Sequence, residues 1–390
     1  MRAPAIIRNT LAGITTSLAM VPEVVAFALL ATVNPLVGLY AAVILGFVTA
    51  AFGGRPGLIS GGAGSLAVVS VALVVSHGVQ YLFACIILMG IFQTVFGLCR
   101  LGRLIRYVTP AVMTGFVNGL ALIIFLSQFK QIPGGGKPLY VMCGLIAVTV
   151  AGVIVAPRIT RKLPASLFGI VLVSAVVLGF GISTKTVGDI AGISGSLPTF
   201  AVPNIPMTLD TLWIILPYSV ILGAIGLMET LLTANLVDDH VRMQDGQRVT
   251  QPNKESVAQG IGNVLTGLFG GMGGCAMIGQ TVINLEAGGY QRLSGIVCAL
   301  AILCYILFAS PVIEAIPVAG LIGVMFVVCY HTFDWKTLSK NREHVVIAAI
   351  VMCTTVLTNL AYAVLLGLAV SWVYSARLRK KDAVASVETR

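Results

Sequence analysis

Charged residues are scarce in this sequence. Only 10% of its 390 residues are Asp, Glu, Lys or Arg, whereas soluble domains carry about 25%. Hydrophobic residues make up 57% of the chain, and apolar runs recur from Leu11 to Tyr374. This composition excludes an ordinary soluble domain and indicates a polytopic, all-α membrane protein.

The sequence also lacks the motifs of common enzymes and metal sites. It contains no GxSxG, Walker or HExxH pattern, and its four histidines have no cysteine or carboxylate partners at ligand spacing. The eight cysteines lie in apolar stretches without CxxC spacing, so we interpret them as packing residues. No cleavable signal peptide is evident, because the first apolar segment continues past Pro22. We therefore expect neither an enzyme nor a resident metal cofactor.

The apolar runs predict fourteen membrane spans joined by short connections. The ninth and tenth spans are too short to cross the bilayer alone. The predicted spans lie near residues 10–31, 36–52, 57–76, 80–99, 107–128, 139–157, 164–182, 211–237, 256–269, 274–284, 293–310, 312–331, 343–358 and 360–376.

The net charge of +10 follows from membrane topology rather than from nucleic-acid binding. With both termini cytoplasmic, this span count places every Lys and Arg on the cytoplasmic side except Lys130, Lys137 and Lys185. Such a bias obeys the positive-inside rule. We therefore expect a multi-pass protein of the cytoplasmic membrane with no nucleic-acid partner, and interpret the segment 238–248 as a solvated cytoplasmic loop.

Two carboxylates, Glu23 and Glu229, lie within apolar spans. An acidic side chain at bilayer depth costs roughly 2.5–3.5 kcal/mol even on lenient insertion scales, so it normally faces a bundle interior or an ion path. The pair favours a transport function.

The two halves of the chain repeat this arrangement. Glycine-rich segments, 60–69 and 270–284, follow Glu23 and Glu229 by about two spans each. Seven spans per half is an odd number, which inverts one half relative to the other, and paired interruptions of this kind indicate a transport site. Half-helices that start after unwound glycine-rich backbone would direct free N–H groups at an anion. The alternative is that these glycines only allow close helix packing.

Several motifs resemble the SulP family of anion transporters over nearly the whole chain. They are PEVVAFAL (22–29), PLVGLYAA (35–42), FGGRPG (52–57), ETLLT (229–233), GLFGGMGG (267–274) and RLSG (292–295). The resemblance implies fourteen spans in a 7+7 inverted repeat, the fold shared with nucleobase permeases. It implies a transmembrane domain over 1–378, with a core at about 10–106 and 211–310 and a gate at about 107–182 and 312–376. Only a short cytoplasmic tail, 379–390, would follow, without the STAS domain that family members usually carry.

The resemblance also assigns a site. By motif position, the anion-binding residues would be Glu23, Phe27, Ser65, Ile278, Gly279 and Gln280. Glu229 and Thr233 match the i, i+4 pair that sodium-dependent bicarbonate carriers of the family use for Na⁺. Two departures concern the charge of the site: many eukaryotic relatives have arginine at the position of Gln280 and glutamine at that of Glu23.

These observations predict a secondary active transporter for bicarbonate or sulfate. We expect an elevator-type mechanism coupled to Na⁺ or H⁺ through Glu229, with no cofactor unless Na⁺ binds at Glu229 and Thr233. The expected partners are the anion, the cation and the lipid bilayer, and the sequence is compatible with a homodimer. The alternatives are a dicarboxylate or nucleobase permease of the same fold, or an uncoupled anion exchanger or channel.

The topology can be tested by cysteine labelling. In a background without native cysteines, a cysteine at Asp245 should be protected from an impermeant reagent added outside the cell, whereas one at Lys137 should be labelled. Equal labelling of both positions from outside would contradict the fourteen-span topology.

Overall fold

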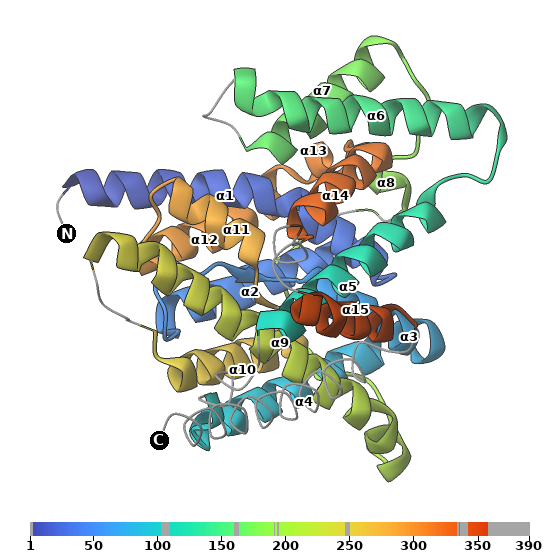
Figure 1. The fold of residues 1–390 in the computed structure, drawn as a ribbon. Helices are drawn as coiled ribbons and strands as arrows, with labels where there is room; N and C mark the ends of the chain where they lie inside the picture. Colours follow the sequence, from blue (N-terminus) through green and yellow to red (C-terminus); the bar gives the residue numbers. More distant parts are fainter. Residues whose placement is uncertain are drawn as a thin grey trace. The chain divides into compact units, whose positions relative to one another are not determined.

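Helices make up most of the protein in the computed structural model (Figure 1). The structure describes residues 3–102, 110–159, 164–190, 192, 195–245, 250–333, 335 and 342–357, so the predicted span 360–376 lies outside the described residues. Contacts divide the chain into two compact units, 1–102 with 127–328 and 103–126 with 329–390.

Each predicted span from 10–31 to 343–358 overlaps a described helix. The longer helices are α1 Ala3–Leu30, α2 Pro35–Phe52, α3 Gly64–His77, α4 Val79–Leu98, α5 Pro110–Gln128, α6 Gly136–Ile159, α7 Ala165–Gly179, α9 Leu209–Asp245, α10 Pro252–Leu268, α11 Ile278–Glu286, α12 Arg292–Phe308, α14 Val318–Thr332 and α15 Arg342–Leu357. The short elements are η2 Phe129–Gln131, α8 Val187–Ile190 and α13 Ser310–Glu314.

Five of the described helices are long and apolar enough to cross a membrane. They are α1, α2, α4, α6 and α9, and α3, α7, α12 and α14 are shorter apolar helices. This finding agrees with a polytopic membrane protein, while the count of fourteen spans stays a prediction.

The turn between α1 and α2 shows how the sequence sets helix boundaries. After α1 the chain passes through Thr32 at a φ of 59°. The side chain of Asn34 then accepts a hydrogen bond from the N–H of Leu36 at 2.9 Å, and Pro35 occupies the first position of α2. An Asn cap followed by proline is a typical helix start.

Glycines bring α4 and α10 into close contact. A Cβ on Gly90 would lie 2.5 Å from the carbonyl oxygen of Gly260, so neither residue has room for a larger side chain. Figure 1 shows the two helices side by side, and α10 also packs on α2. Small residues at a helix interface allow this close approach of backbones in membranes.

Three helices that the sequence assigned to the gate share an apolar cluster within the first unit. Met142 and Ile146 of α6, Val173 of α7 and Ile322 of α14 are buried there. The division into core and gate domains itself stays a prediction.

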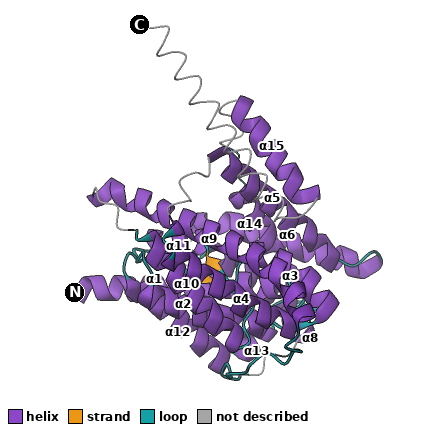
Figure 2. Cartoon of the chain, turned by 90° about the horizontal axis from the view of Figure 1, so that it is seen from below, coloured by secondary structure: helices purple, strands orange, loops and turns teal. Residues whose placement is uncertain are grey.

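Two short strands, one in each glycine-rich segment, pair with each other. Strand β1 (Ser60–Gly61) pairs antiparallel with β2 (Cys275–Ala276), with Ser60 opposite Ala276 and Gly61 opposite Cys275. Figure 2 shows the strands in orange, surrounded by helices. The sequence predicted unwound backbone here but not the pairing, because two-residue strands have no periodicity. A Cβ on Gly274 would overlap the carbonyl oxygen of Gly61, so close packing, the alternative interpretation, also applies to this pair.

A buried ion pair corrects the prediction for the segment 238–248. Helix α9 continues to Asp245, so the segment does not begin as a loop. Asp238 lies 3.2 Å from the guanidinium Nε of Arg55, and the two side chains are only 3% and 4% exposed. This pairing could not be inferred from the sequence, because Arg55 is far from Asp238 along the chain and is one of many basic residues at span ends.

Two more charged side chains, the half-buried Arg292 and the buried Glu255, hold the end of α2. Arg292 donates to the carbonyl oxygens of Ala50 and Ala51, each at 3.0 Å, and to that of Gly53 at 2.6 Å. A cation at the C-terminal end of a helix interacts favourably with the helix dipole. Just after α2, the carboxylate of Glu255 accepts hydrogen bonds from the backbone N–H of Gly54 at 2.6 Å and of Arg55 at 3.0 Å.

Loss of the buried ion pair should destabilise the protein. Removing one partner leaves an uncompensated buried charge, which typically costs about 3–5 kcal/mol. We expect Arg55→Gln and Asp238→Asn each to lower the melting temperature of the detergent-purified protein markedly. Lys254→Gln is the control, because Lys254 is exposed. Melting temperatures equal to that of the Lys254→Gln protein would show that the pair is not a stabilising contact.

Candidate functional site

Two helices begin where the strands end. Helix α3 starts at Gly64 after the cap residue Ala63, and α11 starts at Ile278 after the cap residue Met277. Neither cap residue supplies a side-chain hydrogen bond, so the first N–H groups of both helices lack this partner. Helix starts with free N–H groups and a positive dipole end are suited to binding anions.

The carboxylate of Glu229 connects three elements. Its Oε2 atom accepts a hydrogen bond from the hydroxyl of Ser65 at 2.6 Å and from the thiol of Cys275 at 3.2 Å. Glu229 lies on α9, Ser65 in the first turn of α3 and Cys275 on β2. The structure thus brings together Ser65 and Glu229, which the resemblance assigned to the anion and cation sites respectively.

Thr233 lies one turn after Glu229 on α9, as the i, i+4 spacing predicted. Its hydroxyl donates to the backbone carbonyl of Glu229 at 2.7 Å and lies 3.3 Å from the carbonyl oxygen of Ala276. The neighbouring Thr230 hydroxyl accepts from the N–H of Ala276 at 3.1 Å. The two threonines therefore fasten α9 to β2, and the described contacts of Thr233 are with backbone carbonyls rather than with the Glu229 carboxylate.

Glu23 and Gln280 lie side by side. Glu23 on α1 is 6% exposed and its carboxylate is adjacent to the Gln280 amide in the first turn of α11. The Nε2 atom of Gln280 is buried, yet it makes no hydrogen bond of good geometry with any described residue. Phe27, one turn beyond Glu23, is also buried.

The start of α11 has an open position. Gly279 follows Ile278 in the first turn and is exposed, whereas Gln280 is buried. A Cβ added at Gly279 would meet no atom within 4 Å. The side of this first turn on which Gly279 lies is therefore open.

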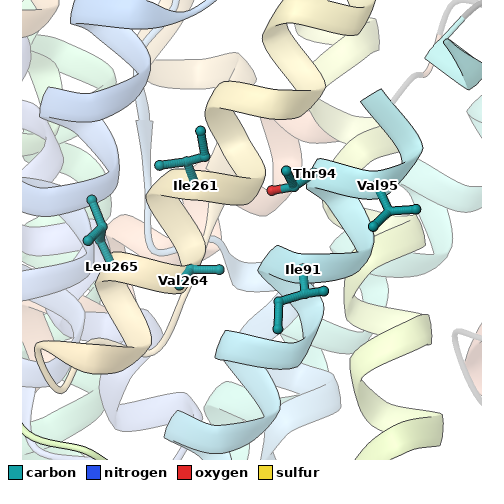
Figure 3. Close-up of a pocket in the computed structure, with 6 residues that line it drawn as sticks. All are labelled: Ile91, Thr94, Val95, Ile261, Val264 and Leu265. Carbon is teal, nitrogen blue, oxygen red and sulfur yellow. The ribbon is translucent and has the colours of Figure 1, made fainter. Parts of the chain in front are cut away.

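An apolar groove elsewhere in the first unit differs from this site. Ile91, Thr94 and Val95 of α4 and Ile261, Val264 and Leu265 of α10 line a cavity of about 280 Å³ (Figure 3). The hydroxyl of Thr94, the one polar side chain in this lining, donates to the carbonyl oxygen of Gly90 at 2.8 Å. The groove therefore offers no free polar group to an anion.

The sequence matches the sulfate permease family over residues 6–139 and 137–355. The chain belongs to this family. It is 42% identical to the Bacillus subtilis protein YbaR, named as a candidate sulfate transporter, over 98% of this chain and 79% of that protein. It is 31% identical to the bicarbonate transporter BicA of Synechocystis over 90% of this chain and 66% of that protein.

Solved structures show the same fold. The transmembrane domain of a cyanobacterial BicA matches with a TM-score of 0.81 and 29% identity, covering 93% of this chain and 98% of that one. Murine Slc26a9 in an inward-facing state matches with a TM-score of 0.78 and 16% identity, covering 95% of this chain and 68% of that one, which concerns the fold alone. Membership of a family of multi-pass anion transporters is thereby confirmed.

Several amides that support the site in this family member were not predicted. Asn263 of α10 accepts from the N–H of Gly274 at 2.9 Å and donates to the carbonyl oxygen of Gly274 at 3.1 Å and to Gln93 at 2.8 Å. Gln259, one turn earlier, donates to the hydroxyl of Ser60 at 2.9 Å. These amides hold both strands in place. Their presence inside apolar spans was the available signal, because polar side chains there are expensive and usually functional.

Cys275 is buried and unbridged, as the packing interpretation predicted, but it also makes a polar contact that the sequence did not predict. This cysteine is fully buried and donates to the Glu229 carboxylate. Its sequence neighbours are glycine, alanine and methionine, so the sequence carried no sign of a polar partner.

Proposed function

We propose that the protein is a secondary active transporter for a small inorganic oxyanion, bicarbonate or sulfate. Its relatives are named as sulfate and bicarbonate transporters, which supports this substrate class. The observation that carries the proposal is the pair of helix starts without side-chain caps, joined through β1 and β2.

The anion would be held mainly by backbone N–H groups at the starts of α3 and α11. The buried Nε2 of Gln280 supports this placement, because an unpaired buried donor costs about 1–3 kcal/mol and an anion could accept its hydrogen bond. Neutral donors recognise charge and size rather than one particular chemistry. Such a site admits both sulfate and bicarbonate.

Glu229 would couple the anion to a cation. Moving one negative charge into a cell against an inside-negative potential costs about 2.3 kcal/mol per 100 mV. A co-transported Na⁺ or H⁺ offsets this cost, and a carboxylate next to the helix start at Ser65 is placed to bind it. The core, 10–106 and 211–310, would carry both ions past the gate in an elevator-type movement, with both termini in the cytoplasm.

Uptake measurements test the substrate class. Labelled sulfate, bicarbonate, a dicarboxylate and uracil should be offered to proteoliposomes, each with and without Na⁺. We expect uptake of sulfate or bicarbonate and none of uracil. Uptake of uracil alone would contradict the proposal.

Bulk at the start of α11 should abolish anion uptake. Gly279→Val adds a side chain in the first turn of α11, where an added Cβ meets no atom within 4 Å. We expect uptake to fall at least about tenfold, corresponding to about 1.4 kcal/mol of lost binding, with an unchanged melting temperature. Gly144→Val is the control, because Gly144 is also exposed on a helix with no atom near its added Cβ. Normal affinity in the Gly279→Val protein would place the site elsewhere.

Neutralising the coupling carboxylate should separate accumulation from exchange. Glu229→Gln keeps the shape of the side chain but removes its charge, so concentrative uptake should fail while exchange between equal pools survives. Glu286→Gln serves as the control, because Glu286 is exposed at the end of α11. If Thr233→Ala weakens Na⁺ dependence in parallel, Na⁺ is the partner, and if only the pH profile changes with Glu229→Gln, H⁺ is the partner. Full accumulation by Glu229→Gln with unchanged responses would reduce Glu229 to a structural role.

A further inference from the structure

The thiol of Cys275 contacts the carboxylate of Glu229, the group on which the proposed coupling depends. The Sγ atom of Cys275 is 3.2 Å from Oε2 of Glu229, and the Ser65 hydroxyl reaches the same oxygen at 2.6 Å. The three side chains come from β2, α9 and α3 and bring one sulfur and two oxygens together, with Ser65 and Cys275 buried and Glu229 half-buried. A cation bound at Oε2 would therefore meet the sulfur as a neighbour.

This donor set suits some cations better than others. Alkali and alkaline-earth cations prefer carboxylate, carbonyl, hydroxyl and water oxygens, whereas thiolates select thiophilic metals. The Ser65 hydroxyl is a hard oxygen donor, but the other group beside Oε2 is the sulfur of Cys275, which is a poor ligand for Na⁺. The described contacts of the Thr233 hydroxyl are with backbone carbonyls and not with the Glu229 carboxylate. The arrangement is therefore a poor match to Na⁺.

We propose that Cys275 sets the cation selectivity of the Glu229 site, weakening it for Na⁺ and making it able to bind a thiophilic divalent cation such as Cd²⁺. The inference rests on the proposed coupling role of Glu229. When Cd²⁺ binds, the Cys275 thiol releases its proton to solvent and a Cd–S bond forms, while the Glu229 carboxylate supplies an oxygen ligand. Occupation by Cd²⁺ would block the transport cycle.

The surroundings fix the position of the sulfur. Cys275 is paired with Gly61 across the two strands. On its other side lies α9, where a Cβ on Gly226 would come within 3.7 Å of the Cys275 Cβ. Serine is smaller than cysteine, so Cys275→Ser fits this space and replaces the sulfur with a hard oxygen. Cys275→Ala removes the sulfur and adds no ligand.

Cation binding to the purified protein tests the inference without any transported anion. Melting temperatures are measured in NaCl against choline chloride and in CdCl₂ against MgCl₂. The wild-type protein should be stabilised by Cd²⁺ and little by Na⁺. Cys275→Ser should lose the Cd²⁺ response and bind Na⁺ at least about tenfold more tightly, a gain of about 1.4 kcal/mol. Cys275→Ala should lose the Cd²⁺ response without gaining Na⁺ binding.

Cys298→Ser is the matched control, because Cys298 is buried in α12 away from this cluster, and it should keep the wild-type pattern. Equal Na⁺ responses of wild type and Cys275→Ser, or a Cd²⁺ response that survives in both Cys275 variants, would overturn the inference. Inhibition of uptake by Cd²⁺ gives a second readout. If the wild type takes up the anion normally but the Cys275 variants respond to Na⁺ and Cd²⁺ as the wild type does, only the role of Cys275 is rejected. If the wild type takes up no anion, the proposed function is rejected.

Discussion

The antiparallel pairing of Ser60–Gly61 with Cys275–Ala276 is the contact on which the candidate site depends. It joins two glycine-rich segments that are far apart in the chain and sets the positions from which α3 and α11 begin. The backbones approach so closely at Gly61 and Gly274 that a side chain at Gly274 would overlap the opposite carbonyl oxygen. In a continuous helix these backbone N–H and C=O groups would pair within the helix. Here some pair between the two strands, and the first N–H groups of α3 and α11 have no side-chain cap. The same backbone irregularity therefore needs support and also supplies the N–H groups of the proposed anion site.

That support comes from polar side chains in apolar helices. Asn263 bonds both the N–H and the carbonyl oxygen of Gly274, and Gln259 holds Ser60. Thr230 and Thr233 hold Ala276 from the α9 side. Each of these groups would be costly in a bilayer without its partner. Glu229 lies within this network, so the proposed binding of a cation there would act on the strands and on the start of α3 together.

Much of the fold could be predicted from the sequence, because hydropathy sets the positions of most helices and the glycine-rich segments indicate where helices are interrupted. The resemblance assigned Ser65 to the anion site and Glu229 to the cation site; the structure places the two in contact, and their roles stay a prediction. Three features could not be predicted. The strands are too short to show a period of two. Asp238 forms a buried ion pair with an arginine that is distant in sequence, and the sequence neighbours of Cys275 are apolar. In each case the deciding partner is a tertiary neighbour.

The location of a bound oxyanion tests the central claim most directly. Selenate has the charge and nearly the size of sulfate, and its selenium atom can be located by anomalous diffraction from crystals soaked in selenate. We predict an anomalous peak within hydrogen-bonding reach of the backbone N–H groups of Ser65 and Gly279 and of the Gln280 amide. A peak bound instead by basic side chains away from the starts of α3 and α11, or none at these helix starts under saturating selenate, would contradict it.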